Sequence, residues 1–309
     1  MKPFVIMADI TCDLTQDLRE RFDVEFIPGH MKTPDGEDIP TELEWTRWTS
    51  DEFYAQLRKN PDAFATSPPN VTELQNAFEA HVKKGDAILA LAISSGLSGT
   101  YGFMLKAKEN ILEQYPDAKI EVVDSLRYST LLGLMTIHAS MLRDEGKSLE
   151  ETAAWLVENR NRFHQMGWLD DLSFVAKKGR VSNSAAFFGT LIGIKPLGDI
   201  DYNGLTTVLG KAKGEKSAYA AIIKYMEETI EDPQDQIIFV AQTNRLRQAK
   251  ILKGMIEEKF SPREVILTDV FPACGVNIGP GLMAAYYLGK PASEGLAEEK
   301  ALMERTLAK

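Results

Sequence analysis

The hydrophobic positions in the first half of the chain form short apolar runs that alternate with longer segments of helical periodicity. The apolar runs predict strands at Phe4–Ile10, Val24–Ile27, Ala87–Ser94 and Ile120–Asp124. The periodic segments predict helices at Thr49–Lys59, Val71–Lys84, Ser98–Tyr115 and Thr130–Gly146. This alternation is typical of βαβ units and a mostly parallel sheet, in which ligand groups gather at the carboxyl ends of the strands.

The pattern changes from about Gly167 onward, where hairpin signals join the strand and helix signals. An Asn-Gly pair within Asp201–Leu205 predicts a tight turn between two strands. Further strands are expected at Gln236–Gln242 and Glu264–Val270, and helices at Ser217–Ile230 and Leu246–Phe260. The chain is therefore expected to be an α/β protein with two domains. Residues 1–163 would form an N-terminal α/β domain and residues 164–309 a C-terminal α+β domain.

Three other segments have distinctive compositions. Pro28–Glu44 is rich in Pro, Gly and acidic residues, which predicts a surface loop, and Leu149–Phe163 has the pattern of a connecting helix. Ala185–Ile194 (AAFFGTLIGI) is unusually apolar and is followed by Pro196. It fits a helix packed into the core of the second domain, and it also fits a wall of a hydrocarbon tunnel lined by its two phenylalanines.

Composition excludes several classes of function. The 309 residues carry a formal net charge of −10 with a pI near 5.1, whereas nucleic-acid binding requires a basic face. The N-terminal apolar run is too short for a signal peptide, and no window approaches a membrane span. Only two cysteines, Cys12 and Cys274, are present, so we expect no disulfide framework and a cytoplasmic location.

Common catalytic and cofactor motifs are absent from the sequence. The four histidines are scattered and form no HExxH or Cys/His cluster, so no metal site is expected. There is no GxxxxGK[ST] loop for ATP and no GxGxxG fingerprint, so no cofactor is expected. The GLSG sequence around Ser98 is not the GxSxG elbow of hydrolases, and no catalytic residue is assigned.

Hydroxyl groups follow several of the predicted strands instead. Thr66 precedes a helix, Ser94 and Ser95 follow the most apolar strand, and Asp124-Ser125 follows the next one. Each is also a common helix cap or turn residue when taken alone. Together they lie where a parallel sheet collects ligand groups, and hydroxyls beside a helix N-terminus suit a small anion such as a carboxylate.

A glycine-dense segment near the C-terminus, Gly275–Gly281 (GVNIGPG), lies between two apolar stretches. It fits a chain reversal with positive φ angles, and it also fits a backbone wall that allows a ligand or loop to approach closely.

Several of these motifs occur together in the order and spacing of one known family. They are Thr66-Ser67-x-Pro69, Ser94–Tyr101 (SSGLSGTY), Val123-Asp124-Ser125, Lys178-Gly179-Arg180-Val181, Gly193-Ile194-Lys195-Pro196 and Gly279-Pro280-Gly281. In these blocks the chain resembles the DegV family over nearly its whole length, and SSGLSGTY is the most specific of them.

The resemblance implies a two-domain fatty-acid-binding protein that is a carrier and not an enzyme. Some bacterial members present the bound acid to a separate kinase subunit, which forms an acyl phosphate for phospholipid synthesis. By this resemblance Thr66 and Ser94 donate hydroxyl hydrogen bonds to the carboxylate, with backbone N–H groups from Ser95 and the following turn and a further contact from Asn277. The C-terminal domain would supply the pocket for the acyl tail, lined by Phe187, Phe188 and Ile192, together with the Gly279–Gly281 loop. Arg180 and Lys213 would dock the kinase, and a transient contact with a membrane is compatible with this role.

The chain departs from the family pattern at four positions. Ile10 stands where the family commonly has Ser, and Pro68 stands where it has Gln. Asn277 replaces a histidine, so it cannot relay a proton, and Lys213 replaces an arginine, so it lacks the planar fork. The hypothesis is that lipid binding is retained while coupling to a kinase is altered or lost.

Two other classes of function remain open from the residues alone. Asp9, Asp13 and Asp124 cluster at the ends of predicted strands and would permit an enzyme that acts on a phosphorylated small molecule. The third hypothesis is a regulatory protein that senses lipid and binds a protein partner through its acidic surface.

Overall fold

A computed structural model describes residues 3–180 and 193–308. The chain divides into two compact units. The first consists of Met1–Thr46, Phe64–Arg160 and Phe271–Ala273, and the second of Arg47–Ala63, Asn161–Val270 and Cys274–Lys309. The main boundary, after Arg160, falls three residues before the expected one. In addition, Arg47–Ala63 belongs to the second unit and Phe271–Ala273 to the first, which a single boundary in the sequence does not allow.

Specific contacts explain the assignment of these two segments. The N–H of Phe271 donates to Asp13 Oδ1 (2.9 Å), and the Phe271 ring lies 5.4 Å from that of Trp45, which attaches 271–273 to the first unit. In the second unit the Tyr54 hydroxyl donates to the carbonyl of Val270 (2.6 Å). Contacts between residues so far apart in the chain do not affect the local hydrophobic pattern. A domain boundary predicted from that pattern therefore cannot take them into account.

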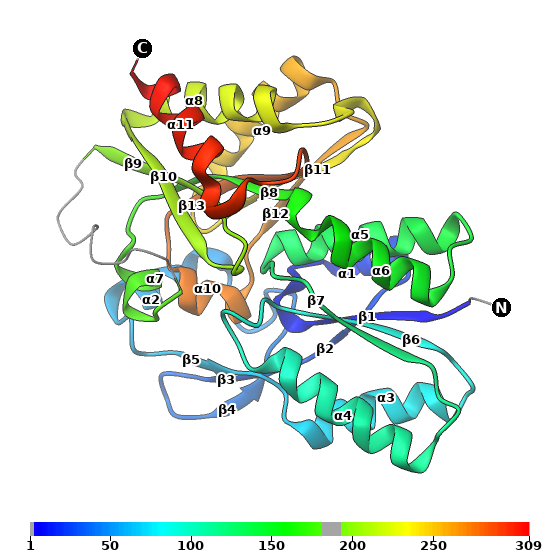
Figure 1. Ribbon diagram of the computed structural model, residues 1–309. Helices are drawn as coiled ribbons and strands as arrows, with labels where there is room; N and C mark the ends of the chain where they lie inside the picture. Colours follow the sequence, from blue (N-terminus) through cyan, green and yellow to red (C-terminus); the bar gives the residue numbers. More distant parts are fainter. Residues whose placement is uncertain (1–2, 181–192, 309) are drawn as a thin grey trace. The chain divides into compact units, whose positions relative to one another are not determined.

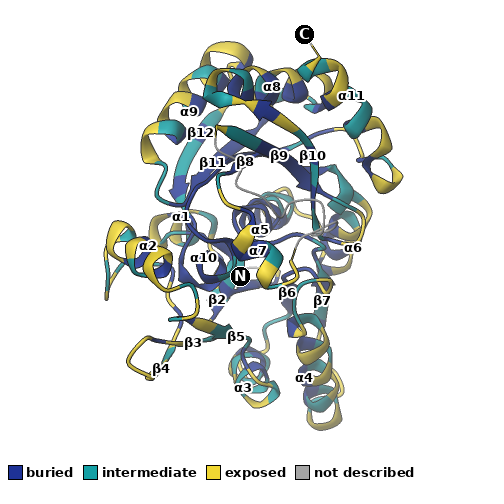
Figure 2. Ribbon diagram, turned by 90° about the vertical axis from the view of Figure 1, so that its left-hand side faces the viewer, coloured by how far each residue is buried: buried dark blue, intermediate teal, exposed yellow. Residues whose placement is uncertain are grey.

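The first unit is built on a four-stranded sheet in the order β2-β1-β6-β7. The strands are β1 (Val5–Asp9), β2 (Glu25–Ile27), β6 (Ile88–Ala92) and β7 (Ile120–Asp124). All three strand pairs are parallel, which confirms the predicted βαβ arrangement. Every residue of β6 is buried, as expected for a central strand covered on both faces (Figure 2).

Helices cover both faces of this sheet, with α3 and α4 on one side and α5 and α6 on the other (Figure 1). The helices are α1 (Gln16–Phe22), α3 (Val71–Val82), α4 (Thr100–Gln114), α5 (Thr130–Asp144) and α6 (Leu149–Asn159). Met7, Phe78 and Met104 belong to the core between the sheet and the α3–α4 layer. The helix expected at Leu149–Phe163 ends at Asn159, because Phe163 begins a strand of the second unit.

The expected surface loop Pro28–Glu44 contains two strands, so that prediction was wrong in part. Strands β3 (His30–Lys32) and β4 (Asp38–Pro40) form an antiparallel sheet with β5 (Ala65–Ser67), in the order β4-β3-β5. Three-residue strands are too short for an alternating pattern, and β5 lies far along the chain from its partner.

The second unit contains a six-stranded mixed sheet in the order β10-β9-β8-β13-β11-β12. The strands are β8 (Phe163–Leu169), β9 (Ile194–Ile200), β10 (Thr206–Lys213), β11 (Ile237–Gln242), β12 (Glu264–Asp269) and β13 (Leu282–Leu288). All pairs are antiparallel except β11 with β12. The hairpin predicted at Asp201–Leu205 joins β9 to β10, and Ile194 lies in β9 and not in the expected apolar helix.

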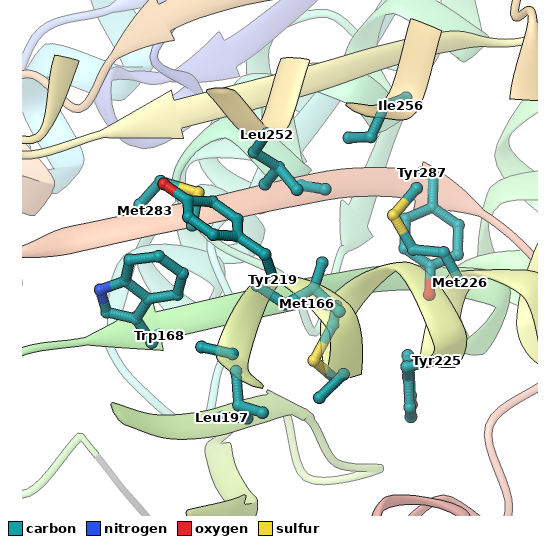
Figure 3. Packing of buried hydrophobic residues seen from close by; sticks show 14 of the residues in the cluster. Met166, Trp168, Leu197, Tyr219, Tyr225, Met226, Leu252, Ile256, Met283 and Tyr287 are labelled. Carbon is teal, nitrogen blue, oxygen red and sulfur yellow. The ribbon is translucent and has the colours of Figure 1, made fainter. Parts of the chain in front are cut away.

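Helices α8 (Gly214–Thr229), α9 (Leu246–Phe260) and α11 (Ala297–Leu307) pack against this sheet. Figure 3 shows the core between them, where side chains from β8, β9 and β13 meet those from α8 and α9. Shorter helices are α2 (Ser50–Lys59), α7 (Ser173–Lys177) and α10 (Pro272–Ile278), with 3-10 turns at Ile10–Cys12, Arg160–Arg162, Pro233–Asp235 and Glu294–Leu296. None of the helices within residues 3–180 and 193–308 has the length and hydropathy needed to cross a membrane.

Candidate functional site

The candidate site of the first unit lies at the carboxyl ends of β1 and β6. These strands are neighbours, but the chain continues from β1 to β2 on one side and from β6 to β7 on the other. Such a reversal of strand order opens a crevice at the carboxyl edge of a parallel sheet, which is where ligands bind in open α/β folds. The segments that follow β1 and β6 are therefore the first candidates for ligand contact.

Asp9 at the end of β1 holds the end of β6. Its side chain is 1% exposed, and its Oδ2 accepts the N–H of Ile93 at 2.6 Å. Its Oδ1 accepts the N–H and the hydroxyl of Thr11. Burial raises the pKa of Asp9, and the hydrogen bonds from Thr11 and Ile93 oppose that rise only in part. Asp9 thus links the two strands at which the strand order reverses.

Ser94 directly follows the residue held by Asp9. It is fully buried, and its N–H donates to the carbonyl of Arg127 at 2.8 Å. Its Oγ accepts the N–H of Gly96 at 3.2 Å. A hydroxyl also has one proton to donate, and no residue within 3–180 or 193–308 accepts it. The Ser94 hydroxyl is thereby oriented by one hydrogen bond and retains a proton for an acceptor.

Three backbone N–H groups after Ser94 have hydrogen-bond partners within the protein. The Ser95 N–H donates to Asp124 Oδ1 at 3.1 Å, and the N–H groups of Leu97 and Ser98 donate to the Ser94 carbonyl. These three N–H groups are thereby engaged within the protein, whereas the Ser94 hydroxyl keeps a proton to donate. The Ser95 side chain is exposed.

Thr66 lies in the middle of β5 and is half-buried. It pairs with Met31 of β3. The end of β5 contacts the loop after β2, because a Cβ atom added to Gly29 would lie 2.8 Å from the Ser67 carbonyl oxygen and 3.5 Å from Ile10 Cγ2. The segment carrying Thr66 therefore meets the segment that follows β1.

Asp13, one of the three aspartates of the enzyme hypothesis, bonds to the protein itself. It is fully buried, its Oδ2 accepts the Ser129 hydroxyl, and its Oδ1 accepts the N–H of Phe271. These contacts tie the turn after β1 to the start of α5 and to the 271–273 segment.

Asp124, the third of these aspartates, has the same kind of role. Its Oδ1 accepts the N–H groups of Ser95 and Leu126, each at 3.1 Å. In residues 3–180 and 193–308, no group of three or more His, Cys, Asp or Glu side chains is placed to hold a metal ion. The contacts of all three aspartates are those of residues that shape loops.

Arg127 was not identified from the sequence and lies directly beside Ser94. It is only 1% exposed, and its carbonyl accepts both the N–H of Ser94 and the hydroxyl of Ser125. Its position in the sequence, shortly after the Asp124-Ser125 pair at the end of a strand, could have identified Arg127 as a candidate site residue. A single arginine in a turn is too common to be singled out on that basis.

The remaining predicted site residues belong to the second unit. Asn277 is half-buried and lies in α10. The glycine-dense segment is helical up to Ile278, and within it only Gly279 and Gly281 have positive φ angles. Lys213 ends β10 and is exposed, as is Arg180, which donates to the carbonyl of Lys178. Phe187, Phe188 and Ile192 lie outside the described residues, so the acyl-tail lining stays a prediction.

Neither cysteine is disulfide-bonded, and both are buried. Burial raises the pKa of the Cys12 thiol to about 12, so this thiol is protonated at neutral pH and is not a candidate nucleophile.

Comparison with known proteins gives a consistent family assignment. The family profile described as "Uncharacterised protein, DegV family" matches residues 3–290. A DegV domain-containing protein of Clostridium perfringens is 33% identical over 289 residues, which cover 94% of this chain and 98% of the relative.

Solved structures agree with this assignment. A DegV family protein from Thermus thermophilus, described for its fatty acid binding, has a TM-score of 0.81 at 26% identity and covers 93% of this chain and 100% of its own. The fatty acid kinase (Fak) B3 protein of Streptococcus pneumoniae, loaded with linoleic acid, has a TM-score of 0.76 at 22% identity, with 92% and 99% covered. With a family profile that spans most of the sequence and a relative matched along nearly its whole length, the chain belongs to the DegV family.

Proposed function

We propose that this protein binds a long-chain fatty acid, with the carboxylate held by the hydroxyls of Ser94 and Thr66. The observation that carries the proposal is the buried Ser94 hydroxyl, which is oriented by the Gly96 N–H and keeps its proton at the carboxyl edge of the sheet. A carboxylate only accepts hydrogen bonds, so hydroxyl donors suit it. The fatty acid binding described for the Thermus thermophilus family member supports the choice of ligand.

The acyl tail would supply most of the affinity. Each buried methylene contributes about 0.8 kcal/mol, so a long chain gains roughly 10 kcal/mol or more before ordering costs are subtracted. Two hydrogen bonds to a charged group add about 1.5–3 kcal/mol each. The head-group contacts would therefore set orientation and selectivity, while Phe187, Phe188 and Ile192 remain the proposed tail lining.

In this proposal the protein is a carrier without catalytic activity of its own. The contacts of Asp9, Asp13 and Asp124 favour a carrier over an enzyme, because all three carboxylates are engaged by backbone N–H groups of their own unit. We also propose a cytoplasmic location, since two buried cysteines outside any disulfide fit a reducing compartment.

Native mass spectrometry of the purified protein, followed by lipid extraction, tests this function. The expected result is one bound fatty acid per chain, of a length that the extraction identifies. A protein that is empty and does not take up added fatty acid would overturn the proposal and point to a different ligand at the same edge of the sheet.

We further propose that coupling to a kinase is weakened in this chain. The likeness to the Streptococcus pneumoniae Fak B3 protein makes such a partner relevant. Asn277 cannot carry charge or relay a proton, and Lys213 presents a point charge without a planar fork. Mixing the loaded protein with the kinase of its source organism and ATP should give slow acyl-phosphate formation, which Asn277→His together with Lys213→Arg should accelerate. Rapid formation by the unaltered protein would contradict this view.

A further inference from the structure

Gly29, between β2 and β3, is held in place by Thr41. The Gly29 N–H donates to Thr41 Oγ1 at 3.0 Å, and the Thr41 N–H donates to the Gly29 carbonyl at 2.9 Å. Both residues are buried, with Thr41 only 3% exposed. Two opposed hydrogen bonds therefore fix both polar groups of the Gly29 backbone.

Gly29 also has no room for a side chain. An added Cβ would lie 2.8 Å from the Ser67 carbonyl oxygen, 3.5 Å from Ile10 Cγ2 and 3.6 Å from Pro69 Cδ. Gly29 is not among the residues with positive φ, so its backbone conformation is open to any residue. The reason for glycine at this position is close approach, because the nearest atom belongs to backbone that cannot rotate away.

The two neighbours of Gly29 lead to the two proposed donors. Ser67 is the residue after Thr66 in β5. Ile10 is the residue after Asp9, and Asp9 holds the N–H of Ile93, which precedes Ser94. A short path thus runs from Thr66 through Gly29 to Ser94, partly along the backbone and partly through the side chains of Ile10 and Asp9.

We propose that Gly29 and Thr41 are positioning residues that set the place of Thr66 relative to Ser94, and thereby the selectivity for a carboxylate over a neutral head group. This inference rests on the proposed function. Two hydroxyls can donate to one carboxylate only when both lie within hydrogen-bonding distance of it. The distance between the donor and acceptor oxygens can vary by only a few tenths of an ångström before the hydrogen bond weakens. A side chain at position 29 displaces the end of β5, so Thr66 moves away from its place, while the substitution alters no residue of the proposed tail lining.

The test compares the affinities of palmitic acid and 1-hexadecanol, which share a chain length and differ in the head group. The unaltered protein should prefer palmitic acid. Gly29→Ala should lower that preference about 10-fold or more, which is the contribution of one hydrogen bond to a charged group. The affinity for hexadecanol should stay unchanged, whereas general damage to the fold would lower both affinities.

Matched variants separate positioning from loss of structure. Gly254→Ala serves as the glycine control, because its added Cβ meets nothing within 4 Å, and it should leave the preference unchanged. If Gly29→Ala does not fold, Thr41→Val removes the hydroxyl that accepts the Gly29 N–H, and Thr41→Ser restores it. The preference should fall in the first variant and return in the second.

The two ideas fail in different ways. An unaltered protein that binds both ligands equally overturns the carboxylate site and, with it, the role of Gly29. An unaltered protein that prefers palmitic acid, together with a Gly29→Ala or Thr41→Val protein that keeps the full preference, overturns only the positioning role.

Discussion

Replacement of Asp199 by alanine should lower the free energy of unfolding by about 3–5 kcal/mol, the loss typical of breaking a buried ion pair. Asp199 and His164 are each 1% exposed, and Asp199 Oδ2 lies 2.6 Å from His164 Nδ1. The second ring nitrogen, Nε2, lies 2.7 Å from the carbonyl of Lys290. Both partners only accept hydrogen bonds, so His164 must carry a proton on each nitrogen and therefore a positive charge.

The remaining partners of Asp199 add to the expected loss. Its carboxylate also accepts the Tyr225 hydroxyl and the N–H groups of Gln165 and Ile200. Alanine leaves all of these donors buried without an acceptor, next to an uncompensated cation. Urea unfolding at neutral pH measures the change, and a loss below about 1 kcal/mol would contradict the ion pair, since even one unmet buried donor costs that much.

Asp199→Asn is the matched control for the charge. The asparagine oxygen can accept the backbone N–H groups, and its NH₂ can donate to a neutral His164, so the loss at pH 7.5 should be smaller than with alanine. A neutral buried histidine must bind a proton on unfolding below about pH 6.5. The stability gap between the asparagine variant and the unaltered protein should therefore widen between pH 7.5 and pH 5.5.

In the unaltered protein the contribution of Asp199 should be lost in acid. Desolvation acts to raise the pKa of Asp199, but the charge of His164 and the hydrogen bonds outweigh it, so the folded pKa lies below the ordinary value. The unfolded state then binds the proton more tightly than the folded state. The stabilisation is present above about pH 4 and is lost as the pH falls through the lowered folded value.

Replacement of both Ser94 and Thr66 by alanine should weaken fatty-acid binding by about 10²-fold or more. Each hydrogen bond to a carboxylate contributes roughly 1.5–3 kcal/mol, and the two hydroxyls are the proposed donors. Ser94→Ala alone should account for about a tenfold loss, because alanine removes the buried proton donor at the carboxyl edge of β6. Isothermal titration with palmitic acid measures both variants.

Ser95→Ala is the matched control for the serine pair. Its side chain is exposed, and its N–H, which the substitution keeps, donates to Asp124. Its affinity should equal that of the unaltered protein. If Ser95→Ala lost affinity as Ser94→Ala is expected to, the assignment of the donor hydroxyl to Ser94 would be wrong.

The parallel sheet of the first unit was predicted well because its signals are local. The run at β6 is apolar throughout, which is typical of a strand covered on both faces, and the helix α3 begins with a capping box between Asn70 and Glu73. Strands β8 and β13 in the second unit were missed. The buried residues of β8 include Gly, Gln and His, which break the apolar run that marks a central strand. Strand β13 is an apolar run, but a short apolar run cannot be told from a buried helix segment by periodicity alone.

The sequence by itself determined the class of the fold, the family, and the position of Ser94 at the end of the most apolar strand, because periodicity and motif spacing act over a few residues. Only the tertiary structure decided the partners of these groups. It turned Asp9 toward Ile93, engaged the N–H of Ser95 with Asp124, and brought Gly29 against the Ser67 carbonyl. Such pairings join residues far apart in the chain, and they depend on how the elements pack and not on the local pattern of either partner.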